Sequence, residues 1–131
     1  LTNRRQRQMC IRDSPYPLKI SRDRVTQEDA PVTFLKPDHV VLNQPNKMTK
    51  SDFDDWVQER GLYFPDGWSK EYQAILSWSD SGEQPKKGGL LIAPYGRGNY
   101  VYTGISFFRE LPAGVSGAYK LLVNLISLSH E

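Results

Sequence analysis

Apolar residues in the first third of the chain occur in short runs that predict β-strands. Residues 18–20, "LKI", and residues 31–35, "PVTFL", are rich in β-branched and aromatic side chains and are bounded by polar or proline-containing segments. The polar segment 22–30 between them predicts a loop. Residues 38–45, "DHVVLNQP", predict a turn, a short extended run and a stop at the final proline.

The clearest helix start is the segment "MTKSDFDDWVQERG". Thr49 is a residue type that caps helices, and Asp52 lies three positions later, where a capping box places its acid. Gly61 is a natural helix end. Apolar residues occupy the positions i, i+3 and i+4 between them, namely Phe53, Trp56 and Val57. The pattern predicts a helix over residues 49–60.

The strongest β signal lies in residues 90–106, "LLIAPYGRGNYVYTGIS". Two apolar runs flank "YGRG", whose glycines permit a tight turn between antiparallel strands. In the second run, Tyr100 and Tyr102 are expected to share one face of the sheet. Residues 62–64 and 73–78 predict two further strands.

The end of the chain, residues 117–129 with the sequence "GAYKLLVNLISLS", predicts a helix. Its apolar stripe consists of Ala118, Leu121, Leu122 and Leu125, widened by Val123, Ile126 and Leu128. A helix with so broad an apolar face is expected to pack against a sheet. The predicted fold class is therefore α/β, with a sheet that ends in an antiparallel hairpin and is packed by the 49–60 helix and the C-terminal helix.

Composition places the chain among soluble globular proteins, because 38% of its 131 residues are hydrophobic and 24% are charged. No apolar run approaches the length of a membrane span, and no signal-peptide pattern is present. The net charge is +2, and residues 1–14 hold all of the excess, with four arginines against one aspartate. Residues 15–131 contain 13 basic and 14 acidic residues. We therefore expect neither nucleic acid nor a membrane as a partner.

Residues 1–14 are predicted to be disordered and foreign to the natural protein. Their segment "QMCIRDS" reverse-translates to a sequence that resembles the transposase end used to fragment DNA for sequencing. We interpret the arm as read-through of a library adapter in a metagenomic assembly, with a natural basic tail as the alternative. On this interpretation Cys10 has no function, and the natural chain upstream of residue 15 is missing. A single cysteine cannot form an internal disulfide.

Two motifs that could carry chemistry have simpler structural interpretations. Gly96 and Gly98 stand between two predicted strands, whereas a dinucleotide loop needs a strand-to-helix context and a third glycine. His39 and His130 are the only histidines, and a catalytic zinc site usually needs three protein ligands. We therefore expect a hairpin turn and two surface or structural histidines.

Candidate nucleophiles and acids are equally sparse. Ser116 in "GVSGA" is one residue out of register with the nucleophile elbow of serine hydrolases. Asp52, Asp54 and Asp55 form a cluster that is expected to act in helix-end electrostatics rather than in acid–base catalysis. The sequence predicts no catalytic, cofactor-binding or metal-ligating residue.

Aromatic residues make up 11% of the chain, and most of them are expected in the core. Trp68 and Trp78 flank predicted loops, which makes them the better candidates for stacking on a sugar ring. Tyr95 and Arg97, beside the glycines of the predicted hairpin, complete the set of expected ligand-contact residues.

Two blocks of the chain resemble the C-terminal end of large bacterial PIG-L family deacetylases. They are "FLKPDHVVLNQPNKMTKSDFDDWVQERGLYFPDGW" and "GGLLIAPYGRGNYVYTGISFFRELPAGVSGAYKLLVNLISL". In that family a zinc-dependent N-acetylglucosaminyl deacetylase-type domain lies near the N-terminus. A class I glutamine amidotransferase-like domain, flavodoxin-like in fold, closes the chain. The resemblance covers residues 15–131 and implies that they form part of this last domain.

The catalytic residues of that family do not carry over to this sequence. The His-Pro-Asp-Asp-Glu type motif, which supplies zinc ligands and a carboxylate base, does not occur, since residues 37–39 read "PDH". Residues 15–131 also contain no cysteine to serve as an amidotransferase nucleophile. The resemblance therefore implies a non-catalytic fragment with a scaffolding or ligand-contact role. Zinc is expected in the missing N-terminal domain of the parent, which would hydrolyse an N-acetyl group of an amino sugar.

The partners implied by this resemblance are the upstream domains of the same parent chain and a carbohydrate ligand. The alternative is an independent module that binds carbohydrate or a protein partner without enzymatic activity. Localisation stays open, with export of the parent to the periplasm or the exterior among the outcomes. Upstream sequence would discriminate between the two interpretations, because only the first requires a deacetylase motif in the same reading frame.

Overall fold

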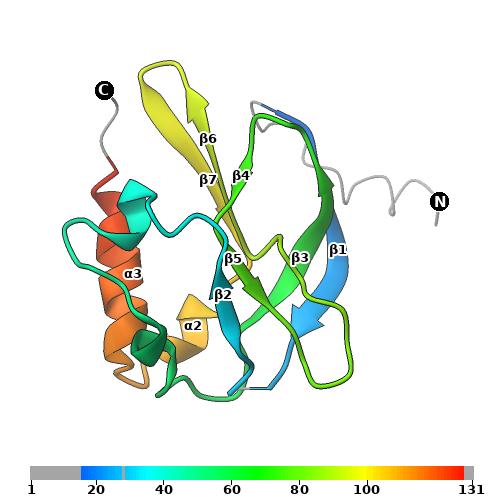
Figure 1. The fold of residues 1–131 in the computed structure, drawn as a ribbon, viewed down its shortest axis with the longest axis vertical. Helices are drawn as coiled ribbons and strands as arrows, with labels where there is room; N and C mark the ends of the chain where they lie inside the picture. Colours follow the sequence, from blue (N-terminus) through cyan, green and yellow to red (C-terminus); the bar gives the residue numbers. More distant parts are fainter. Residues whose placement is uncertain (1–15, 28, 129–131) are drawn as a thin grey trace.

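The computed structural model describes residues 16–27 and 29–128, which form a mixed α/β fold (Figure 1). The predicted arm of residues 1–14 lies outside this range. The strands are β1 (Leu18–Val25), β2 (Val32–Phe34), β3 (Gly61–Trp68), β4 (Gln73–Ala74), β5 (Leu76–Trp78), β6 (Leu90–Tyr95) and β7 (Gly98–Thr103). The helical elements are the 3₁₀ turns η1 (Val40–Leu42) and η2 (Lys50–Phe53) and the helices α2 (Phe107–Glu110) and α3 (Ser116–Ile126).

The strands of the described residues form three small sheets, in which β1 pairs with β3, β2 with β5, and β6 lies between β4 and β7. Every one of these pairs is antiparallel. A bridge between Gly61 and Ile105 joins the start of β3 to the residues after β7, so the β1–β3 sheet adjoins the sheet that contains β7. The mixed α/β class is confirmed, and its sheet content is antiparallel.

The β6–β7 hairpin is confirmed as predicted. Its register is regular from Leu90 opposite Thr103 to Tyr95 opposite Gly98. Gly96 adopts a φ of +57° at the first central position of the turn, a conformation that glycine reaches without steric cost. The hairpin projects from the body of the molecule in Figure 1.

Strand β6 is buried on both faces, which explains its uninterrupted apolar run. Leu90 and Ile92 join the main core, which β2, β5, η1, η2 and α3 complete. Leu91 and Ala93 point to the other face and pack with a second cluster that contains Tyr72. Because successive strand residues alternate in direction, a strand between two clusters must be apolar at every position.

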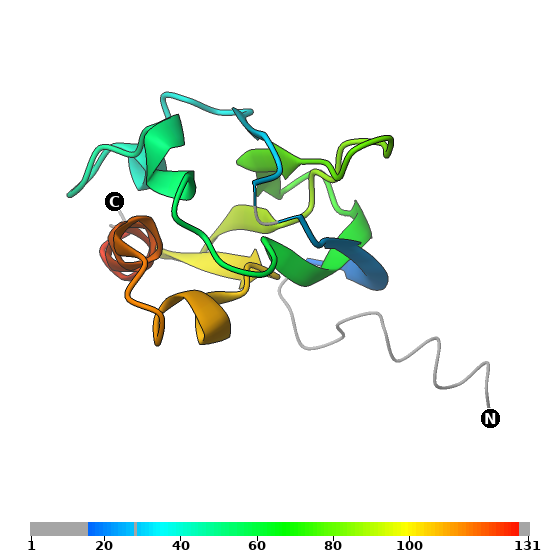
Figure 2. The same ribbon diagram turned by 90° about the horizontal axis from the view of Figure 1, so that it is seen from below.

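Helix α3 lies at one side of the molecule and the β1–β3 ribbon at the opposite side, in both views (Figures 1 and 2). The predicted packing of this helix is confirmed, since Ala118 and Leu121 are buried in the main core. The predicted stripe is too wide, because Val123 and Ile126 are exposed. No helix within the described residues is long and apolar enough to cross a membrane.

Three local predictions in the first half of the chain are wrong in extent. Strand β1 continues through Arg22, Arg24 and Val25, which were expected in a loop. Strand β3 begins at Gly61 rather than ending a helix there, and runs on through "PDG" to Trp68. The expected extended run after Asp38 is instead η1, whose N-terminus is capped by the preceding histidine.

The predicted helix over residues 49–60 exists only as its first turn, η2. The start is correct, because Thr49 and Asp52 form the expected capping box. The next turn does not form because the donor and the acceptor of its hydrogen bond, the Val57 N–H and the Phe53 carbonyl, both bind other partners. The Val57 N–H, which would bond to Phe53 in a helix, donates to Glu110 at 2.8 Å.

The Phe53 carbonyl, which would accept the missing helical bond, instead accepts from a buried arginine. The Arg60 guanidinium donates to the Phe53 carbonyl and to the Ala30 carbonyl. The Trp56 indole similarly donates to the Asp52 carbonyl at 3.0 Å. Gln58 then adopts a φ of +65°, which turns the chain into β3. Long-range partners thus outcompete the local helix.

Candidate functional site

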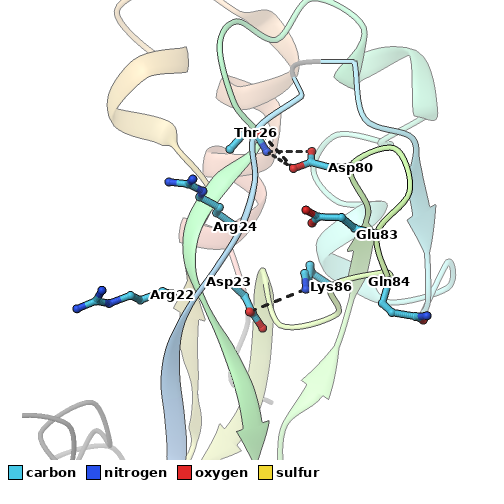
Figure 3. Close-up of a pocket in the computed structure, with 8 residues that line it drawn as sticks. All are labelled: Arg22, Asp23, Arg24, Thr26, Asp80, Glu83, Gln84 and Lys86. Carbon is cyan, nitrogen blue, oxygen red and sulfur yellow. Dashed lines mark hydrogen bonds and ion pairs between the residues drawn. The ribbon is translucent and has the colours of Figure 1, made fainter.

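A polar cavity of about 450 Å³ lies between strand β1 and the loop that follows β5 (Figure 3). We call it the charged cavity, and its lining side chains bear both signs of charge. They are Arg22, Asp23, Arg24, Thr26, Asp80, Glu83, Gln84 and Lys86. None of them was predicted as a site residue.

Asp80 is committed to holding the end of β1. Its carboxylate accepts hydrogen bonds from the Thr26 N–H, the Thr26 hydroxyl and the Gln27 N–H, at 2.9–3.1 Å. Partial burial raises the pKa of Asp80, but these hydrogen bonds and the positive charge of Arg24 outweigh it and leave the pKa below its ordinary value. Asp80 therefore links the loop after β5 to the end of β1, two segments that are distant in sequence.

The charged cavity is also lined by an ion pair between Lys86 and Asp23. Lys86 Nζ lies 3.9 Å from Asp23 Oδ1, and both side chains retain solvent access. Figure 3 shows these two side chains pointing toward one another, whereas Arg22 and Arg24 point to the other side of β1. An exposed pair at this distance contributes little to stability, so Lys86 and Asp23 can exchange it for a ligand.

A smaller cavity of about 240 Å³ adjoins the charged cavity and brings in one predicted residue, Trp68. We call it the Trp68 cavity. It shares Asp23 and Lys86 with its neighbour and adds a second carboxylate, Asp66. Its remaining lining residues are Pro65, Pro85 and Lys87. Trp68 ends strand β3 and is partly buried, which leaves part of its ring free to contact a ligand.

The other predicted tryptophan, Trp78, is not at the surface. It ends strand β5, is 1% exposed, and packs edge-on against Phe53 at 5.8 Å and tilted against Phe64 at 6.0 Å. Its indole N–H has no hydrogen-bond partner among the described residues. The expectation that Trp78 presents its ring to a ligand is corrected: the residue precedes a loop but points inward, into the core.

Tyr95 and Arg97 lie at the tip of the hairpin and line neither cavity described above. Tyr95 is 60% exposed, and its ring makes an edge-on contact with Tyr16 at 6.5 Å. The Tyr16 hydroxyl donates to the Pro94 carbonyl at 2.8 Å, which ties this tyrosine to the hairpin. The structure thus places the four predicted contact residues in three separate places.

The structural interpretation of His39 is confirmed. Its Nδ1 accepts the Val41 N–H at 3.1 Å and caps η1, while burial and the nearby Lys36 lower its pKa. Asp52 also acts as a helix-end group and pairs with Lys120 at 3.0 Å. Cys10 and His130 lie outside the described residues.

Residues 16–27 and 29–128 contain no group of three or more side chains that could hold a metal ion. They therefore do not offer the ligand set that a catalytic zinc requires. Comparison of the chain with protein-family models, with curated proteins and with solved structures gave no match. The described residues thus show a mixed α/β fold with polar cavities beside β1.

The sequence did contain a signal for the cavities. The segment "SRDRV" alternates basic and acidic side chains, and a period of two is the signature of a strand with two distinct faces. The polar composition of this segment favours a loop, and a loop prediction does not indicate that Arg22 and Arg24 share one side of a strand. The distant loop around Asp80, which supplies the opposite wall, had no local signal.

Proposed function

We propose that this chain is a non-catalytic module that contacts carbohydrate and belongs to the C-terminal part of a PIG-L family deacetylase-like protein. The observation that carries the ligand-contact role is the Trp68 cavity, where an aromatic ring and two carboxylates line one depression. The parent assignment depends on the sequence resemblance of residues 15–131.

The chemistry of the Trp68 cavity suits a sugar. The face of an indole packs against the C–H face of a pyranose ring, and it supplies large contact area at a small entropic cost. Carboxylates such as Asp23 and Asp66 accept hydrogen bonds from sugar hydroxyls, and the ammonium group of Lys86 donates to them. A cavity of about 240 Å³ fits one or two sugar units at its mouth rather than an enclosed substrate.

In the parent protein, this chain would form the end of a flavodoxin-like, amidotransferase-like sheet. Such a sheet is mainly parallel, whereas the strand pairs of the described residues are antiparallel, so the parallel strands would have to come from upstream. The zinc chemistry would likewise reside upstream, and we assign no step of it to the residues of this chain. The role left to this region is to scaffold the parent and to contact its glycan.

The alternative proposal is an independent module that binds carbohydrate or a protein partner. It uses the same Trp68 cavity and differs only in what precedes residue 15. Sequence upstream in the same genomic context tests this directly. A His-Pro-Asp-Asp motif in the same frame supports the parent assignment, whereas a native start codon just before Pro15 supports the independent module.

Glycan binding by the 131-residue chain tests the ligand-contact role. We expect a neutral or amino-sugar oligosaccharide to bind, by calorimetry or on a glycan array, and Trp68→Ala to abolish that binding. Lys36→Gln, an exposed cation outside both cavities, serves as the control and should bind normally. Near-ultraviolet circular dichroism checks that Trp68→Ala remains folded. Absence of binding to every glycan tested would refute the carbohydrate role, and deacetylase turnover by this chain with added zinc would refute its non-catalytic status.

A further inference from the structure

The register of the β1–β3 ribbon shifts at three places, and two adjacent β-bulges among them lie around Arg22 and Arg24. In the first, Ser21 and Arg22 stand opposite a single step of β3. In the second, one position further along, Leu62 and Tyr63 stand opposite Arg24. Bulges redirect side chains and often occur beside binding sites. Two of them in succession place arginines of one strand next to a tyrosine of the other.

Tyr63 is held in a conformation that a tyrosine rarely adopts. Its φ is +57°, in the left-handed region, and yet its ring is 60% exposed. The backbone around it is held by neighbouring elements, since the Tyr102 hydroxyl donates to the Tyr63 carbonyl at 3.0 Å. The Leu62 N–H is fixed in turn by the Gly104 carbonyl at 2.8 Å. A strained backbone conformation persists only where surrounding contacts hold it, and such positions cluster at ligand sites.

Arg22, Arg24, Leu62 and Tyr63 line a cavity of about 330 Å³, which we call the arginine cavity. Both arginines are exposed, and within the described residues neither guanidinium makes an ion pair. Figure 3 shows both side chains pointing away from Asp80 and Glu83, the carboxylates on the far side of β1. Both side chains therefore extend on the side of β1 where they line the arginine cavity, although Arg24 is still close enough for its charge to lower the pKa of Asp80.

We infer that the arginine cavity binds an anionic saccharide, with its carboxylate or sulfate held by Arg22 and Arg24 and its ring against Tyr63. Guanidinium groups match a planar oxyanion with paired hydrogen bonds. The exposed tyrosine ring beside them offers a stacking surface for a sugar. The choice of a saccharide as the carrier of the oxyanion depends on the proposed function, whereas the anion site depends only on the geometry of the double bulge.

The test compares ligands that differ only in charge. The full chain is titrated by calorimetry with an oligosaccharide of galacturonic acid and with the neutral galactose oligosaccharide of equal length. Inorganic sulfate is the third ligand. We expect the uronate to bind more tightly than the neutral sugar, and its affinity to fall as salt is raised.

Variants assign this binding to the cavity. Arg22→Gln combined with Arg24→Gln should weaken uronate binding by roughly tenfold or more, because two charge-assisted contacts are lost. The charge-matched control combines Lys36→Gln with Lys47→Gln, at two exposed lysines outside the cavity, and should change the affinity by less than about twofold. Tyr63→Gly accepts the positive φ, so it removes the ring without disturbing the fold, and it should also weaken uronate binding.

Each outcome decides between the proposals. Equal binding of the charged and neutral sugars, or equal losses in the two double variants, would overturn the anion site. Binding of sulfate without the uronate would overturn the saccharide. Loss of neutral-sugar binding in Trp68→Ala with normal uronate binding would support both sites as separate. Absence of neutral-sugar binding with intact, arginine-dependent uronate binding would count against the Trp68 site alone.

Discussion

Replacing Asn124 by leucine is expected to destabilise the protein strongly, although it puts an apolar residue at a buried position of helix α3. Asn124 is 0% exposed in α3. Its amide nitrogen donates to the Val41 carbonyl and to the Asn46 carbonyl, both at 2.7 Å. Its amide oxygen accepts the Asn46 N–H at 3.0 Å. One side chain therefore fastens the helix to η1 and to the loop that precedes η2.

The size of the effect follows from what leucine leaves behind. The Val41 residue is fully buried, so its orphaned carbonyl costs about 1–3 kcal/mol. Asn46 is partly exposed, so water can replace its bonds to Asn124 at a cost of about 0.5–1 kcal/mol together. Leucine regains about 0.5 kcal/mol because it is a better helix former than asparagine. The net loss is about 1–3.5 kcal/mol.

Urea unfolding followed by tryptophan fluorescence measures this loss, and the midpoint of thermal unfolding should fall by roughly 4–13 °C. Val123→Leu is the control, because it places leucine at the neighbouring, exposed position of α3 and removes no hydrogen bond. It should change the free energy of unfolding by less than about 0.5 kcal/mol. If Asn124→Leu unfolds within that same margin of the wild type, the three hydrogen bonds do not stabilise the fold as argued.

Three further substitutions test other parts of the fold. Burial raises the pKa of Glu110, so its ionisation costs stability as the pH rises above 4.5; Glu110→Gln should flatten the decline in unfolding free energy above that pH in urea titrations. Gly117→Ala should destabilise by about 1–3 kcal/mol in thermal unfolding, against the usual gain of alanine in a helix, because its methyl group would lie 1.7 Å from the Asp52 carbonyl oxygen. Asp80→Asn should cost about 1 kcal/mol at pH 7, and that difference should vanish as the pH falls through the lowered pKa of Asp80, since only the charged form is favoured by its bonds to Thr26 and Gln27.

The elements that the sequence predicted well are those whose determinants are local. The β6–β7 hairpin needs only two apolar runs and a glycine at the turn, and all of these lie within a short segment. Helix α3 needs only its apolar period, and the buried Ala118 and Leu121 are on that period. Neither element depends on a partner that is far away in the sequence to choose its conformation.

The helix expected over residues 49–60 failed for the opposite reason. Its capping box and apolar spacing are real, and they form η2. The second turn was lost to Glu110, which is more than fifty residues away and binds the Val57 N–H. A propensity summed over one segment contains no information about such a competitor, so a correct start could be read but the end could not.

The candidate site shows the same division between local and distant determinants. Trp68 and Trp78 have the same residue type and both close a strand, yet one lines a cavity and the other fills the core. What separates them is the sheet environment. Trp78 belongs to β5, which pairs with β2 and is buried along its length, whereas Trp68 ends the more exposed β3. Strand burial depends on pairing, and pairing cannot be read from a tryptophan next to a loop.

Both proposed ligand sites adjoin the irregular β1–β3 ribbon. Regular alternation along a strand already sets Arg22 and Arg24 on one face of β1 and Asp23 on the other. The two register shifts beside these residues change which β3 residues they face, and the Ser21 hydroxyl bridges the strands there by donating to the Phe64 carbonyl at 2.5 Å while accepting the Asp23 N–H at 3.0 Å. As a result Asp23 turns toward Lys86 and the Trp68 cavity, and the arginines turn toward Tyr63. Strand β1 thereby presents the Asp23 carboxylate to the Trp68 cavity and two guanidinium groups to the arginine cavity, and the two proposed sites depend on this separation.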